Sequence, residues 1–138
     1  MSVSPVIGID LDNTIINYNN AFIKSVSQLD FISEDWINNN LPDSDEISPK
    51  VFIKKYLLTQ DDGQYKWEAL QGHVYGKFIH YAEVFPGVAN FLAHSKRRGN
   101  KVFVVSHKTE YGHYDESKTS LRKAAMDFLE KNDLFSST

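Results

Sequence analysis

Two aspartates near the N-terminus have the type and spacing needed for carboxylate chemistry. Asp10 and Asp12 stand two residues apart in the stretch IDLDNT, which ends at Thr14 and directly follows a short apolar run. In open α/β sheets, ligands bind outside the carboxyl ends of the strands, so both carboxylates can face the same space there. Such carboxylates can serve as nucleophile, as acid or base, or as ligands of a hard cation.

A solvated turn is the other interpretation of the same motif, because Asp, Asn and Thr are common turn formers. The flanking sequence favours chemistry. Val6 to Asp10 is an apolar run with β-branched residues, which predicts a strand buried on both faces. A second strand is predicted at Lys101 to Ser106, and we expect it to lie parallel to the first and beside it.

Helices are predicted on the C-terminal side of the chain. Gly87 to Arg98 has apolar residues at helical spacing, and Gly99 stands where a glycine that ends a helix belongs. A final helix is predicted from about Ser117 to Asn132, because its apolar residues form one stripe.

The long segment from Tyr18 to Tyr81 predicts helices and no convincing strand. We expect helices at Ala21 to Leu29, at Ser48 to Leu58 (with Ser48 as N-cap and a proline after it), and at Gln64 to His80. A parallel crossover needs only about a dozen residues, so this connection is far longer than required. We therefore interpret the excess as a helical module over the carboxyl end of the sheet.

Two sequence motifs carry a resemblance to a known family. IGIDLDNT resembles motif one of the haloacid dehalogenase (HAD) superfamily, and VFVVSHKT resembles motif two, a strand that ends in Ser or Thr, here Ser106. The helical insertion between them resembles the family's C1 cap. The stretches WEALQGHVYG, FPGV and VVSHKTEYGHY further resemble a bacterial subgroup often linked to surface-polysaccharide gene clusters.

This resemblance spans essentially the whole chain and implies an α/β fold. The expected architecture is a partial HAD-like, Rossmann-type core with parallel strands, formed by residues 1–16 and 82–138, with a small helical cap formed by residues 17–81.

The resemblance also implies roles for individual residues in a phosphatase of a small phosphorylated metabolite. Asp10 would attack phosphorus to form an aspartyl-phosphate, and Asp12 would act as general acid and then as base. Mg²⁺ would be held by the Asp10 carboxylate and the Asp12 main-chain carbonyl. Thr14 would order the loop, and Ser106 would donate its hydroxyl to a phosphate oxygen.

Two further parts of the family pattern are not evident in the sequence. One is a lysine that neutralises the phosphate, for which Lys108 and Lys118 are the candidates. The other is an acidic pair after a later strand, which completes the metal site. We therefore expect a shortened form of a longer phosphatase, whose own activity stays open. The alternative is a non-catalytic remnant that binds metal, phosphate or a partner; a receiver-type phospho-acceptor domain ranks last.

Composition limits the other possibilities. The 138 residues suffice for one domain, and a net charge of −3 argues against a nucleic-acid-binding surface. The chain has no cysteine, which excludes disulfides, thiolate chemistry and cysteine zinc sites. The sequence shows no signal peptide and no apolar stretch long enough to span a membrane, so we expect a cytoplasmic protein. An incompletely covered core would favour association with a second copy.

Overall fold

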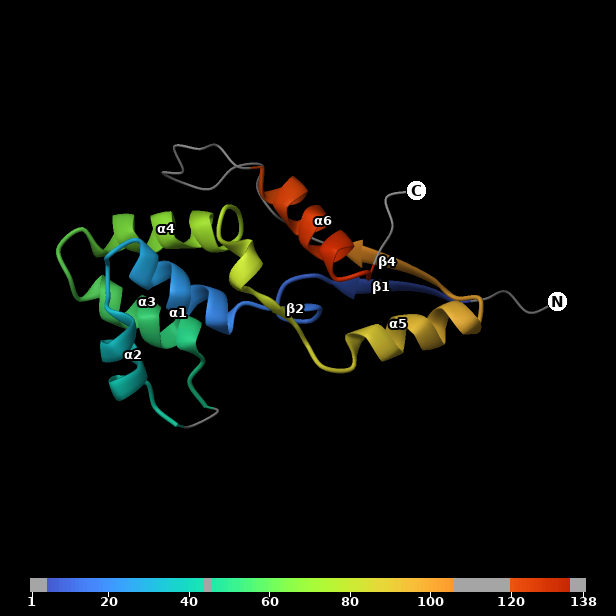
Figure 1. Ribbon diagram of the computed structural model, residues 1–138, viewed down its shortest axis with the longest axis horizontal. Coiled ribbons are helices and arrows are strands. Elements are labelled where there is room, and N and C mark those ends of the chain that lie inside the picture. Colours follow the sequence, from blue (N-terminus) through green and yellow to red (C-terminus); the bar gives the residue numbers. More distant parts are fainter. Residues whose placement is uncertain (1–4, 44–45, 106–119, 135–138) are drawn as a thin grey trace.

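The computed structural model describes residues 5–43, 46–105 and 120–134. Within them the chain is a mixed α/β protein, as predicted, with a parallel pair of strands and several helices. Figure 1 shows the helices α1 to α4 at one end of the molecule, while strands β1 and β4 and helices α5 and α6 lie at the other.

The two predicted main strands are confirmed, and so is their parallel pairing. β1 (Val6–Asp10) pairs with β4 (Lys101–Val105), and Asp10 lies opposite Val105 at the carboxyl ends. The expected end of the second strand at Ser106 falls outside the described residues.

The sheet is covered less completely than predicted. Ile9 and Val104 pack against the buried core, to which α6 contributes, but Val6, Phe103 and Val105 are 62%, 55% and 44% exposed. In-register residues of parallel strands point to the same side, so these three side chains share one face. The prediction of a strand buried on both faces is therefore wrong. An apolar run indicates a buried environment without showing how many faces are covered.

Two helices flank the strands (Figure 1). α5 (Val88–Arg97) leads into β4, and Gly99 follows it with φ +73°, as expected for a glycine that ends a helix. α6 (Leu121–Lys131) begins after Ser120, whose hydroxyl accepts a hydrogen bond from the Lys123 amide. The predicted start of this helix at Ser117 lies outside the described residues.

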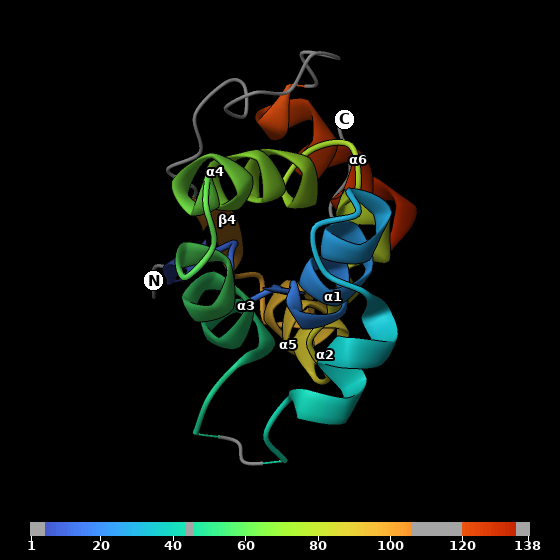
Figure 2. The same cartoon turned by 90° about the vertical axis from the view of Figure 1, so that its left-hand side faces the viewer.

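The helical segment contains α1 (Asn19–Gln28), α2 (Glu34–Asn40), α3 (Pro49–Leu58) and α4 (Gly63–Val74). Helices α1, α3 and α4 pack on one another; Figure 2 shows them from their own end of the molecule, with the strands behind. Their shared core is fully buried and contains Phe22, Val26, Ile53, Leu57 and Leu70.

The boundaries of two helices follow from single residues. Ser48 is the N-cap of α3, as predicted, because its hydroxyl accepts from the Val51 amide. At the start of α4, a Cβ on Gly63 would lie 2.2 Å from the Leu57 carbonyl oxygen, so the α3–α4 turn requires glycine.

The helix predicted from Gln64 to His80 is shorter in the structure. α4 ends at Val74, and a turn through Gly76 leads to a short 3₁₀ helix, η1 (Ile79–Tyr81). The Gly76 and Phe78 amides both donate to the His73 carbonyl, which closes this turn.

A small antiparallel ribbon, which the sequence did not predict, joins the two passages of chain between the ends of the molecule. β2 (Ile16–Asn17) pairs with β3 (Glu83–Val84). The predicted cap boundaries after residues 16 and 81 fall beside this ribbon, and the division into cap and core stays a prediction. The ribbon ties the loop that follows β1 to the chain that returns from the helices.

Candidate functional site

The loop after β1 folds back tightly on itself. The Leu11 carbonyl accepts hydrogen bonds of 3.1 Å from the amides of both Ile15 and Ile16, and the Asn13 amide donates to the Ile16 carbonyl. Asn13 has φ +62°, a left-handed conformation that asparagine tolerates better than most residues. Leu11, Ile15 and Ile16 are buried, so the loop is anchored by its apolar side chains.

Asp12 is held from outside this loop by a tyrosine. The Tyr18 hydroxyl donates a 2.5 Å hydrogen bond to Oδ1 of Asp12, at the short end of the range for a bond to a carboxylate. Tyr18 is only 2% exposed, and it is the N-cap residue of α1. The aspartate of the loop is thus fastened to the first residue of the helical segment.

Asp10 is exposed at the end of β1, and its charge is one of those that act on Tyr18. Burial raises the pKa of Tyr18 far above its ordinary value, and the hydrogen bond to Asp12 and the charges of Asp12, Tyr75 and Asp10 add to that rise. Asp10 and Asp12 stand two residues apart, at and just beyond the carboxyl end of β1, and the described hydrogen bond of this pair is that from Tyr18 to Asp12.

The contacts of Tyr18 continue into the helical segment. Its ring meets that of Tyr75 edge to face, with centroids 4.8 Å apart. The Tyr75 hydroxyl accepts a 3.1 Å hydrogen bond from the Lys50 ammonium, which also lies 5.7 Å from the centroids of the Phe22 and Tyr75 rings. A chain of contacts therefore runs from Asp12 to a cation on α3.

Tyr18, Tyr75 and Lys50 were not predicted as site residues from the sequence. One signal was available: Tyr18 stands six residues after Asp12, at the start of the predicted helical segment. Tyr75 and Lys50 had no comparable signal, since each reaches the site only through tertiary packing.

Of the remaining predicted site residues, one lies within the described part of the chain and the others lie outside it. Thr14 is exposed in the folded-back loop, next to the aspartates in sequence. Ser106 and Lys108, predicted to bind substrate, lie outside the described residues, as does Lys118. Ser106 directly follows Val105, which is the register partner of Asp10.

Some of the oxygen ligands that a metal site needs are present at Asp10 and Asp12. Carboxylate and main-chain oxygens at Asp10 and Asp12 are the ligand type that Mg²⁺ prefers. Within residues 5–43, 46–105 and 120–134, however, no group of three acidic or histidine side chains gathers closely enough to hold a metal ion. The described part of the chain therefore supplies two acidic residues of the predicted centre without a third.

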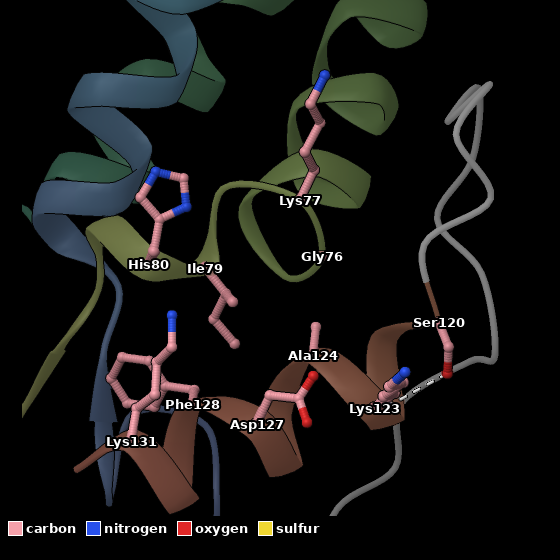
Figure 3. Close-up of a pocket in the computed structure, with 10 residues that line it drawn as sticks. All are labelled: Gly76, Lys77, Ile79, His80, Ser120, Lys123, Ala124, Asp127, Phe128 and Lys131. Atoms are coloured by element: carbon pink, nitrogen blue, oxygen red, sulfur yellow. Dashed lines mark hydrogen bonds between the residues drawn. The ribbon is translucent and has the colours of Figure 1, made fainter.

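A separate cleft of about 480 Å³ lies between the η1 region and α6, and Figure 3 shows its lining. Its floor contains apolar residues, and its rim carries charges of both signs. The Lys77 side chain points away from α6, whereas the Lys131 side chain points toward His80 (Figure 3). Neither aspartate of the loop lines it; the residues around it are Gly76, Lys77, Ile79, His80, Ser120, Lys123, Ala124, Asp127, Phe128 and Lys131.

No protein-family model matches this chain, and no curated protein sequence matches it either. In the described residues, every helix is too short or too polar to cross a membrane.

Proposed function

We propose that the protein is a HAD-type phosphatase that hydrolyses the phosphate monoester of a small metabolite, with Asp10 as nucleophile. One observation carries the proposal. Asp10 ends a strand of a parallel pair, and Asp12, two residues further along the chain, accepts a hydrogen bond from a buried tyrosine. The carboxyl end of parallel strands is where α/β proteins bind ligands, which supports an active site at this place.

The chemistry follows from the two carboxylates. A carboxylate oxygen of Asp10 attacks phosphorus in line with the ester oxygen, the P–O bond to the alcohol breaks, and an aspartyl-phosphate forms. Asp12, in its acid form, gives its proton to the departing oxygen. Water then attacks the aspartyl-phosphate while Asp12 takes its proton, which releases phosphate and restores both side chains.

A bound Mg²⁺ would neutralise charge on the transferring phosphoryl group. The oxygens of the Asp10 carboxylate and the Asp12 main chain are the groups of this chain that would hold it. Asp10 is exposed, so its carboxylate is open to a cation and a phosphate at once.

The helical segment is proposed to act as a cap that limits the size of the substrate. The N-cap residue of helix α1 is Tyr18, which bonds to Asp12, and Lys50 on α3 is linked to Tyr75, whose ring contacts that of Tyr18. These contacts support a cap that faces the aspartates. A cap of this kind would admit a small phosphorylated metabolite, which is the substrate class that we propose.

The test is hydrolysis of p-nitrophenyl phosphate with Mg²⁺ by the 138-residue chain. We expect slow turnover that Asp10→Asn reduces by roughly 10³-fold or more, since the amide cannot form the covalent intermediate. Asp61→Asn, a neutralisation of an exposed aspartate in the α3–α4 turn, is the matched control and should retain the wild-type rate. Equal rates for wild type and Asp10→Asn would refute the nucleophile.

One observation favours a second candidate, a protein that binds metal or phosphate without turnover. It is the lack of a third acidic metal ligand among the described residues. Calorimetric titration with Mg²⁺ and inorganic phosphate separates the two. Binding that depends on Asp10, together with no Asp10-dependent hydrolysis, would favour the second candidate.

A further inference from the structure

The contact between Tyr18 and Asp12 is a short hydrogen bond from a tyrosine whose own position is fixed by its surroundings. The hydroxyl lies 2.5 Å from Oδ1 of Asp12, and the tyrosine that carries it is almost completely buried. Its backbone is fixed too, because the Tyr18 carbonyl accepts the Phe22 amide in the first turn of α1. Its ring is held edge to face by Tyr75.

We infer that Tyr18 is a positioning residue that orients Asp12 for proton transfer to the leaving group. This inference rests on the proposed function. An aspartate in a loop has two rotatable side-chain bonds, and an acid must reach its target oxygen within about 2.6–3.2 Å. A donor fixed at Oδ1 selects one side-chain orientation of Asp12, and with it the direction in which the carboxyl group can deliver a proton.

The Tyr18 hydroxyl is a neutral donor. A phenol is protonated at neutral pH, and in the structure this hydroxyl donates to Oδ1 of Asp12. Tyr18 therefore moves no proton in the reaction. It acts only through the orientation of Asp12.

Two substrates of similar shape test this role. Phenyl phosphate needs a protonated leaving oxygen far more than p-nitrophenyl phosphate, whose nitro group stabilises the phenolate. We expect Tyr18→Phe to lower kcat/KM for phenyl phosphate by roughly 10-fold or more and for p-nitrophenyl phosphate by less than about 3-fold. The ratio between two substrates of one enzyme is independent of the folded fraction, so partial unfolding cannot imitate this result.

Tyr81→Phe is the matched control, because it removes a tyrosine hydroxyl that only receives a hydrogen bond from Gln28 at an exposed position. It should leave the substrate ratio unchanged. In an Asp12→Asn background, where no acid remains to be oriented, Tyr18→Phe should have no further effect on either substrate.

An unchanged substrate ratio in Tyr18→Phe would overturn the inference while leaving Asp10-dependent turnover, and with it the proposed function, intact. Equal losses from Tyr18→Phe in the wild-type and Asp12→Asn backgrounds would overturn it as well. If the wild-type chain shows no Asp10-dependent turnover of either substrate, the proposed function fails and the role of Tyr18 fails with it.

Discussion

Replacing Tyr18 by phenylalanine removes one oxygen atom and keeps the ring that packs against Tyr75. The substitution therefore removes the hydrogen bond to Asp12 without removing the ring. A hydrogen bond to a charged group contributes about 1.5–3 kcal/mol, and water replaces part of it where the acceptor is only half-buried, as Asp12 is. We expect Tyr18→Phe to lower the free energy of unfolding by about 1–2 kcal/mol.

Urea denaturation at neutral pH measures this change. With a slope of about 1–3 kcal/mol per molar urea for a small protein, the midpoint should fall by roughly 0.3–2 M. A double-mutant cycle with Asp12→Ala isolates the pair, since Tyr18→Phe should cost much less once the carboxylate is gone. The expected coupling free energy is about 1–2 kcal/mol.

A coupling below about 0.3 kcal/mol, which is within the additivity of independent sites, would show that the hydroxyl and the carboxylate do not interact in solution. Tyr18 could then not orient the side chain of Asp12. Tyr81→Phe serves again as the control and should change the unfolding free energy by less than about 0.5 kcal/mol, as surface substitutions usually do.

Two further predictions concern the packing around the site. Gly63→Ala should destabilise the protein by several kcal/mol in urea denaturation, because the new Cβ would collide with the Leu57 carbonyl oxygen. Gly8→Ala is the control and should be tolerated, because its Cβ would lie 3.4 Å from the Val105 side chain. Similar stabilities for the two variants would contradict this account. Phe103→Lys should leave stability nearly unchanged and reduce concentration-dependent association in light scattering, because Phe103 is exposed on the open face of the sheet; unchanged association would exclude that face as the contact.

The sequence predicted those elements whose signals are local. β1, β4 and their parallel pairing follow from two apolar runs separated by a long crossover. The start of α3 follows from Ser48 and the proline after it, since a serine cap and a proline in the first turn are both set within a few residues. Gly99 likewise marks the end of α5 by its positive φ.

The errors concern features that depend on distant partners. A short apolar run has the same residue types whether one or both faces of the strand are covered, so the exposure of Val6 and Phe103 was not predictable from their types. The early end of α4 at Val74 depends on the turn through Gly76, and glycine inside a helical pattern gives only a weak signal. β2 and β3 have two residues each, too few for any periodicity.

The site itself shows the same division between local and distant information. Asp10 and Asp12 were predicted as site residues because they stand at the end of a predicted strand, which is a local pattern. The support of Asp12 was missed, because a tyrosine at the start of a helix carries no signal for the carboxylate that it will meet. The contacts from Tyr75 to Lys50 span 25 residues and follow only from helix packing.

Two places in the molecule can be compared as candidate sites: the cleft between the η1 region and α6, and the surroundings of Asp12. Lys123, Asp127 and Lys131 are spaced by four along α6, so they lie on one helical face and the aspartate can compensate a neighbouring lysine. All three are exposed, as expected for an ordinary solvated face. Around Asp12, by contrast, a buried phenol is aimed at a carboxylate at the end of parallel strands, an arrangement that solvation alone does not explain. Because the charged side chains at the cleft are exposed, whereas Asp12 accepts a hydrogen bond from a buried tyrosine just beyond the end of β1, the aspartates are the stronger candidate for chemistry.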